Sequence, residues 1–286
     1  MELLATTNRG LESVAIEEIA ALTGATATVE HPGMVGFRAD EAAVYRLTAG
    51  ARSIHRVLLV VARTTVADLD GIYRATRESD PPAYLSPNRS FAVRAQRRGE
   101  QAFESPDVAS TVGQAVVDSY EAPPAVELDD PEVVLRATVR EERFVLAADA
   151  TGRSLHRRWY RRVEHDAALR PTVAYAMLHV GGYDPSDRLV DPMCGCGTIP
   201  IEAALAARTR SPATDREPAL VRLRPFEAAR YRDVRAELTE SGTDPGPIVG
   251  RDADPDRGRP RERGRGRGSR GCRVRGGRRD RPVGHG

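Results

Sequence analysis

The alternation of apolar and polar residues predicts that the first part of the chain is a small α+β unit. Apolar residues recur at helical spacing over residues 11–22 and 40–50, and Asp40 is the expected N-cap of the second of these helices. Strands are predicted at residues 2–6, 25–31, 34–40 and 54–64. The order strand, helix, strand, strand, helix, strand indicates a ferredoxin-like domain, which we place at residues 1–65.

A second α+β unit is predicted over residues 66–151. It begins with a helix over 67–79 and a strand over 90–99, and it ends with two strands within 133–150 that turn at 140–143. Between them lies a helix over 105–120, with Ser105 as the expected cap and Pro106 in its first turn. Its predicted buried stripe consists of Val108, Val112, Ala115 and Val116.

The pattern then changes to that of an α/β domain, which we place at residues 166–256 after a linker over 152–165. Helices are predicted at 172–183, 198–210 and 225–242, and short strands at 187–191 and 248–254. After Asp256 the periodicity ends, and residues 257–286 have almost no apolar side chains, so we expect a disordered Arg/Gly tail.

The stretch DPMCGCGTIPIEAA, residues 191–204, carries the clearest chemistry. A strand, a glycine turn and a helix form the start of a nucleotide-binding unit, and Gly195 and Gly197 allow a tight turn or close approach to a ligand. The stretch is not a P-loop, and Pro200 stands where the dinucleotide fingerprint needs its third glycine. An acid at the strand end, Asp191, suits a cationic ligand without phosphate, such as S-adenosylmethionine. Asp252 follows about one unit later, where a ribose-binding acid belongs.

This stretch resembles the cofactor loop of the THUMP-domain RNA methyltransferases, which modify guanine N2 in tRNA or 23S rRNA. The segments SFAVRAQRRG, SPDVASTVGQAVVDSY and VVLRATVREERFVLAADATG resemble the THUMP domain, and SLHRRWYRR resembles the family's linker. The resemblance implies a Rossmann-like methyltransferase domain. It also implies a set of cofactor-binding residues: Asp191, Cys194, Gly195, Gly197, Thr198 and Asp252, with Asp254 a less favoured ribose ligand.

The family's catalytic motif, Asn/Asp-Pro-Pro-Tyr/Phe, does not follow the loop in this sequence. The two asparagines, Asn8 and Asn88, do not precede a proline pair, and Asp80-Pro81-Pro82 lies before the loop. We therefore assign no catalytic residue. We expect a truncated or frameshifted product after residue 256, with little or no catalysis. The alternatives are a non-catalytic THUMP RNA-binding protein and an N6-adenine-specific DNA methylase.

Arginines that could contact RNA gather at two places, the end of the predicted strand 90–99 and the linker. In the linker they stand beside Trp159 and Tyr160, and this combination favours RNA because arginine pairs with phosphates while aromatic rings stack on bases. The predicted RNA-binding residues are Arg97, Arg98, Arg153, Arg157, Arg158, Arg161 and Arg162.

The composition of the chain bears on its charge distribution, on possible disulfide and metal sites, and on its location. The 286 residues carry a net charge of +2, which divides into +10 for residues 257–286 and −8 for the rest. Three cysteines make no disulfide framework, and neither they nor the six histidines have metal-ligand spacing, so no metal is expected. With no long apolar run and no signal-peptide pattern, we expect a cytoplasmic protein that does not associate with membranes. The oligomeric state is left open.

Overall fold

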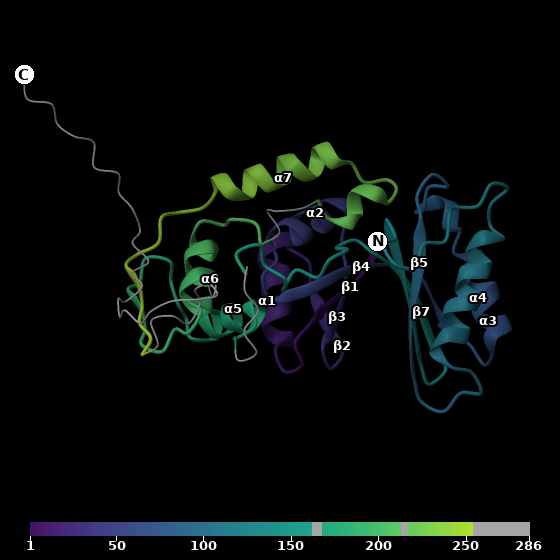
Figure 1. Cartoon of the computed structure of the whole chain (residues 1–286), viewed down its shortest axis with the longest axis horizontal. Coiled ribbons are helices and arrows are strands. Elements are labelled where there is room, and N and C mark those ends of the chain that lie inside the picture. The colour runs from purple at the N-terminus through teal and green to yellow at the C-terminus, as the bar shows by residue number, and fades with distance from the viewer. Residues whose placement is uncertain (162–167, 213–216, 254–286) are drawn as a thin grey trace, which may run out of the picture.

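The computed structural model describes residues 1–161, 168–212 and 217–253. Its first half is built on a single mixed sheet (Figure 1). The ferredoxin-like part contributes β1 (Glu2–Thr7), α1 (Glu12–Thr23), β2 (Ala27–His31), β3 (Met34–Arg38), α2 (Glu41–Gly50) and β4 (Ile54–Thr65). The next part contributes α3 (Leu69–Glu78), β5 (Phe91–Arg98), α4 (Ser105–Val117), β6 (Val133–Arg140) and β7 (Arg143–Asp149).

The two predicted α+β units share one seven-stranded sheet. Its strand order is β2-β3-β1-β4-β7-β6-β5, and β4 joins the two halves by pairing antiparallel with β7 from Leu58↔Asp149 to Thr65↔Arg143. The helices cover one face, where the main apolar core lies. The opposite face carries a small apolar cluster around Leu4, Leu58 and Ala147. Within the part of the chain that the structure describes, no helix packs over this broad face, which runs across both units.

Helix capping follows the sequence at one of the two predicted sites. Asp40 caps α2 by accepting a hydrogen bond from the amide of Ala43 at 3.0 Å, as predicted. The prediction that Ser105 caps α4 is wrong. Glu104 is the N-cap and forms a capping box with Asp107, while Ser105 Oγ accepts from the amide of Arg97 at 3.1 Å. The acid one residue earlier supplies the stronger acceptor for the helix N-terminus.

The described part of the α/β domain contains α5 (Pro171–Val180), β8 (Leu189–Asp191), α6 (Thr198–Ala207), α7 (Ala228–Glu240) and β9 (Ile248–Gly250). Strands β8 and β9 pair in parallel, and α5 packs against α6. Figure 1 shows α5 and α6 at the end of the molecule opposite α3 and α4, with α7 lying over α2. The predicted tail at 257–286 lies outside the described residues. Within the described residues, no helix is long and apolar enough to cross a membrane.

Candidate cofactor loop and RNA-facing cavity

The glycine loop is held between the ends of the two parallel strands. The amide of Arg251 donates to the carbonyl of Asp191 at 2.8 Å, and the amide of Cys194 donates to the carbonyl of Arg251 at 2.8 Å. Gly250 allows this close approach, because a Cβ there would lie only 3.0 Å from Cys194 Sγ and 3.3 Å from Pro200 Cγ. The pairing thereby brings Asp191 and Asp252 to the same carboxyl edge.

The loop itself turns through two left-handed glycines, as predicted. Gly195 has φ of +52° and Gly197 has φ of +75°, a region that glycine enters without steric cost. Among the described residues, apart from its chain neighbours, no atom lies within 4 Å of a Cβ placed at Gly195, and Met193 is 83% exposed. The described part of the chain therefore leaves the loop facing open space rather than a packed interior. Helix α6 begins directly after it, so the free amides of its first turn lie beside the loop.

The polar groups at this edge of the sheet fit S-adenosylmethionine. The carboxylate of Asp252 accepts from the amide of Gly195 at 2.8 Å, and that of Asp191 accepts from the amide of Met193 at 3.1 Å. Two part-exposed carboxylates beside a glycine turn suit an ammonium group and ribose hydroxyls. Cys194 is half-buried in the loop, whereas Thr198 is buried and its hydroxyl accepts from Arg161 Nη2 at 3.2 Å.

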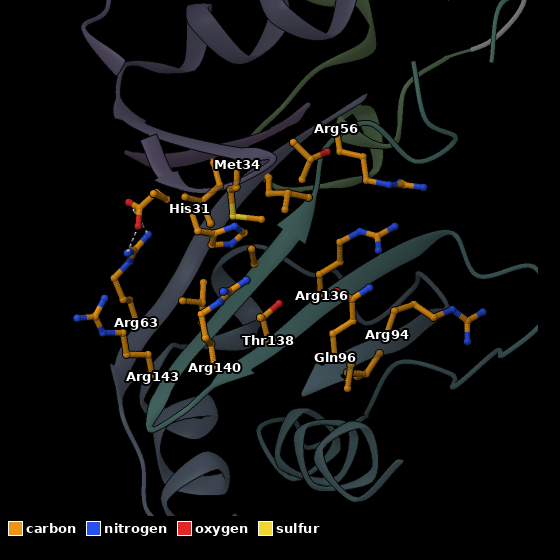
Figure 2. A pocket seen from close by; sticks show the side chains of 18 of the residues that line it. His31, Met34, Arg56, Arg63, Arg94, Gln96, Arg136, Thr138, Arg140 and Arg143 are labelled. Atoms are coloured by element: carbon orange, nitrogen blue, oxygen red, sulfur yellow. Dashed lines mark hydrogen bonds and ion pairs between the residues drawn. The ribbon is translucent and has the colours of Figure 1, made fainter. Parts of the chain in front are cut away.

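A cavity of about 1030 Å³ lies on the helix-free face of the sheet and also reaches the first turns of α4, where Ser105, Pro106 and Ala109 line it. Its floor includes the apolar cluster of Leu4, Leu58 and Ala147, and Glu30 is the one acid among its lining residues. Figure 2 shows arginines extending from several strands around this space. They are Arg56 and Arg63 of β4, Arg94 of β5, Arg136 and Arg140 of β6, and Arg143 of β7.

The arginines that line the cavity differ in whether they form ion pairs with carboxylates of the protein. Arg56 and Arg136 both bind the buried carboxylate of Asp149, at 2.5 and 2.8 Å. Within residues 1–161, 168–212 and 217–253, no carboxylate lies within ion-pair distance of Arg140 or Arg143. These last two guanidiniums therefore add positive charge that the described protein does not neutralise, which suits an anionic ligand.

Two histidines line the end of the cavity nearest the linker. The rings of His55 and His156 lie 5.2 Å apart, and His55 Nε2 lies 3.2 Å from Thr172 Oγ1. Burial lowers the pKa of His55 to about 4, with a smaller effect from His156, and burial beside Arg157 lowers the pKa of His156 to about 4. Both rings are therefore neutral at pH 7.

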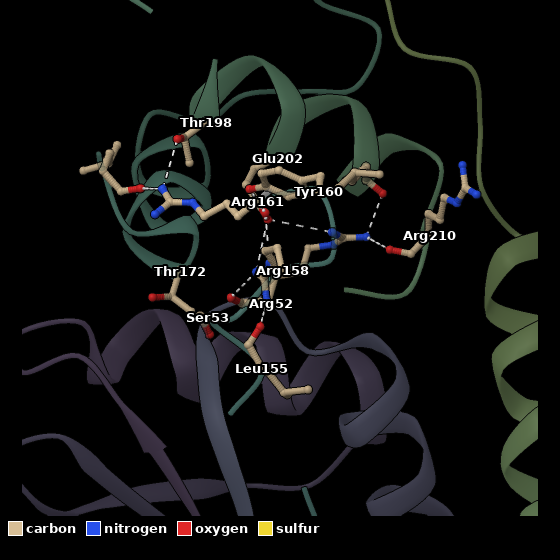
Figure 3. A network of polar contacts seen from close by, with 12 residues as sticks. Arg52, Ser53, Leu155, Arg158, Tyr160, Arg161, Thr172, Thr198, Glu202 and Arg210 are labelled. Atoms are coloured by element: carbon tan, nitrogen blue, oxygen red, sulfur yellow. Dashed lines mark hydrogen bonds and ion pairs between the residues drawn. The ribbon is translucent and has the colours of Figure 1, made fainter. Parts of the chain in front are cut away.

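Arg158 is among the RNA-binding residues predicted from the sequence, but the structure buries it. The residue as a whole is 2% exposed, and its guanidinium forms a two-pronged ion pair with Glu202 of α6, with Nε to Oε1 at 2.9 Å and Nη2 to Oε2 at 3.1 Å (Figure 3). Tyr160 donates its hydroxyl to the same carboxylate at 2.7 Å, and burial raises the pKa of Tyr160. A guanidinium enclosed in this way cannot reach an RNA phosphate in this structure.

The other predicted RNA-binding residues lie in different settings. Arg161 is half-buried against Thr198, and Arg97 pairs with Glu104 at 2.6 Å. Arg98, Arg153 and Arg157 are exposed, and Arg162 lies outside the described residues. The guanidinium of Arg210 lies over the ring of Trp159, 5.5 Å from its centroid.

Sequence reasoning missed both the cavity and the partner of Arg158, although each left a signal. Arg136, Thr138 and Arg140 stand at alternate positions of a strand whose other positions are apolar, which marks a polar sheet face. Glu202 is a lone acid in the apolar helix TIPIEAALAA, and a buried acid needs a cation.

Comparison with known families assigns three segments of the chain. Residues 2–58 match the RlmL ferredoxin-like domain, residues 66–149 match the THUMP domain, and residues 158–257 match the RMKL-like methyltransferase domain. These matches agree with the predicted order of domains.

Curated relatives carry the names of RNA methyltransferases. A tRNA (guanine(6)-N2)-methyltransferase of Archaeoglobus fulgidus is 36% identical over 71% of this chain and 53% of its own length. A ribosomal RNA large subunit methyltransferase K/L of Pseudoalteromonas atlantica is 32% identical over 76% of this chain and 32% of its own length. The chain thus spans about half the length, or less, of these relatives.

Solved structures show the same fold. A predicted N6-adenine-specific DNA methylase from Listeria monocytogenes is 27% identical with a TM-score of 0.80, over 88% of this chain and 68% of its own. The methyltransferase-like protein SMU.472, solved with SAH, is 26% identical with a TM-score of 0.79, over 90% and 69%. TrmN from Thermus thermophilus is 28% identical with a TM-score of 0.61, over 89% and 74%. With its ferredoxin-like, THUMP and methyltransferase domains in this order, the chain belongs to the THUMP-domain-containing methyltransferases.

Proposed function

We propose that this chain supplies the RNA-binding and cofactor-binding parts of an S-adenosylmethionine-dependent methyltransferase that acts on guanine N2 of a tRNA or rRNA. The observation that carries the proposal is the open glycine loop at the edge where Asp191 and Asp252 meet, in one chain with an arginine-lined sheet face. The names of the relatives support RNA as the substrate. A cytoplasmic location belongs to the same proposal.

In this proposal the residues of the loop bind and orient the cofactor. Asp252 would accept hydrogen bonds from the ribose hydroxyls, Asp191 would face the cationic end, and Gly195 and Gly197 would let the backbone lie close. Cys194 and Thr198 would line the loop. When bound, the cofactor supplies a methyl group on a sulfonium, and transfer to an exocyclic amino group releases one proton. The protein's contribution is to position the two reactants and exclude water.

RNA would lie on the helix-free sheet face. The cavity combines arginines with an apolar floor, which suits phosphates together with unstacked bases. The exposed Arg98, Arg153 and Arg157 remain proposed contacts at its margins, and Arg97 and Arg161 are proposed contacts that must first leave their present partners. We expect the 286-residue chain to bind both ligands.

Calorimetry with S-adenosylhomocysteine tests the cofactor site. Asp252→Asn should weaken binding at least tenfold, because the neutral amide is a poorer acceptor for ribose hydroxyls. Asp244→Asn is the matched control and should bind like the wild type, since Asp244 lies at the surface and, among the described residues, forms an ion pair with the exposed Arg208 alone. Equal affinities for the two variants would remove Asp252 from the site.

Filter binding of an unmodified tRNA transcript and of duplex DNA separates the alternatives. The proposal requires the protein to prefer tRNA and also to bind S-adenosylhomocysteine. Binding of tRNA with no heat from S-adenosylhomocysteine would favour a non-catalytic RNA-binding protein. Preference for DNA would favour an adenine-specific DNA methylase.

A further inference from the structure

Helix α6, which follows the cofactor loop, is held at its start, middle and end by side chains from outside it. Arg161 reaches Thr198 at the first residue, and Arg158 and Tyr160 bind Glu202 at the centre. Arg52 donates from Nη2 to the carbonyls of Leu205 at 2.7 Å and Arg210 at 2.6 Å, near the helix end. We name Arg52, Arg158, Tyr160 and Arg161, together with Glu202, the α6 clasp (Figure 3).

The central ion pair of the clasp is buried, and its geometry restricts the relative orientation of the two side chains. The side chains of Arg158 and Glu202 have 0% exposure, and Arg52 Nη1 lies 3.9 Å from Glu202 Oε2. A planar guanidinium that binds both oxygens of a carboxylate fixes orientation as well as distance. Arg52 adds a positive charge near the C-terminal end of α6, where it complements the helix dipole. Apolar packing alone would hold the helix without fixing its rotation or translation so narrowly.

The clasp is built on the ferredoxin-like domain. The buried carboxylate of Glu18 in α1 accepts from the amide of Arg52 at 2.7 Å and from the amide of Ser53 at 2.9 Å. The carbonyl of Arg52 accepts from Arg158 Nη2 at 2.9 Å. One backbone segment between α2 and β4 therefore binds α1, the linker and α6 together.

We propose that Arg52 and Arg158 are positioning residues for the cofactor loop, so that the ferredoxin-like domain completes the cofactor site without touching the cofactor. Fixing α6 fixes its first turn, and Gly197 directly precedes that turn. The same contacts hold the loop at one position relative to the arginine-lined sheet face. The inference rests on the proposed function for its binding consequence, but its structural claim can be tested separately.

The test uses the full chain with both central partners replaced, Arg158→Met together with Glu202→Met. This double variant removes both charges of the central pair, whereas a single replacement would leave one of them buried without its partner. Arg52 loses its contact with Glu202 in this variant but keeps its hydrogen bonds to the carbonyls of Leu205 and Arg210. We expect hydrogen exchange at residues 191–207 to accelerate about tenfold and S-adenosylhomocysteine affinity to fall about tenfold. Affinity for tRNA should stay within twofold of wild type, because the sheet face is unchanged. A merely structural role would lower both affinities together.

Two further variants keep the test decisive. Arg52→Met retains the pair between Arg158 and Glu202 but removes the contacts to the helix end, so exchange should accelerate from Leu205 onward and S-adenosylhomocysteine affinity should fall three- to tenfold. Arg232→Met, an exposed arginine of α7 that belongs to neither proposed site, is the matched control and should match wild type. A folded clasp variant with wild-type exchange at residues 191–207 would overturn the proposal. Failure of the wild type to bind S-adenosylhomocysteine would instead count against the proposed function, leaving the exchange result to decide the clasp.

Discussion

Two groups of arginines in this chain carry the same charge but lie in opposite surroundings. On the strands, Arg140 and Arg143 line an open cavity, and the described residues provide these two with no ion-pair partner, although Arg56 and Arg136 beside them bind Asp149. In the linker, Arg158 is buried in an ion pair with Glu202 of α6, and Arg161 donates a hydrogen bond to Thr198 of the same helix. The denser cluster in the sequence is thus partly internal structure, while the dispersed one forms the surface available to an anion.

The difference follows from how each segment can direct its side chains. A strand sends alternate residues to opposite faces, so arginines spaced by two on neighbouring strands gather on one side of a sheet. The linker has no such periodicity, so the direction of each side chain depends on the tertiary contacts that it makes. Local charge density therefore gives no measure of how much charge remains for a ligand.

The largest effect should come from the linker group. Arg158→Ala leaves the carboxylate of Glu202 buried with its main cation removed, and we expect a loss of about 3–5 kcal/mol in the free energy of unfolding. Urea denaturation followed by circular dichroism measures it. Arg157→Ala, next in the chain and exposed, should change the value by less than about 0.5 kcal/mol. Similar losses for the two variants would contradict the contrast between buried and exposed linker arginines.

The cavity group should affect binding rather than stability. Arg140→Gln with Arg143→Gln should weaken tRNA binding about tenfold and reduce the slope of log affinity against log salt by about 2, because each lost phosphate contact removes about one unit. Filter binding across a salt series measures both quantities. Unchanged salt dependence would place the RNA elsewhere, and unchanged unfolding in urea serves as the control for folding.

The two histidines at the boundary between the groups predict a pH effect. The pKa of both His55 and His156 is about 4 in the folded protein, below the usual 6.5. The unfolded chain therefore takes up protons between pH 6.5 and 4 while the folded protein does not, so stability falls as pH falls through this window and levels off below it. Because both rings are part-exposed, we expect about 1 kcal/mol for the pair.

Thermal unfolding at pH 7, 6, 5 and 4 checks the pH prediction. Other groups titrate in the same range, so the comparison is with His55→Asn plus His156→Asn, whose pH dependence should be flatter by that amount. An identical pH dependence in wild type and variant would show that folding does not lower the pKa of the two imidazoles.

The smallest effect should come from the exposed linker arginines. Arg153→Gln with Arg157→Gln should weaken tRNA binding only two- to threefold, because these exposed side chains flank the cavity residues Ser154 and His156 in sequence and solvent screens them. The same filter-binding assay measures it. A loss larger than that of the Arg140 and Arg143 pair would reverse the assignment and restore the linker as the main RNA contact.

The sequence alone determined the local elements and the cofactor loop. Period-two and helical patterns located the strands and helices, and the spacing of Asp191, Gly195 and Gly197 indicated the strand, turn and helix that the structure contains. These features depend on neighbours in the chain, so a single sequence carries them. The capping error at Ser105 shows the limit, since adjacent acceptors compete and the choice depends on geometry.

Which charges remain available to a ligand depends on contacts between residues far apart in the chain. Arg158 meets Glu202 across 44 positions, and Arg52 reaches the carbonyl of Leu205 across 153. The cavity likewise exists because β4 pairs with β7 and joins two units into one sheet. Whether an ion is solvated or buried depends on what the whole fold places around it, and no local pattern encodes that.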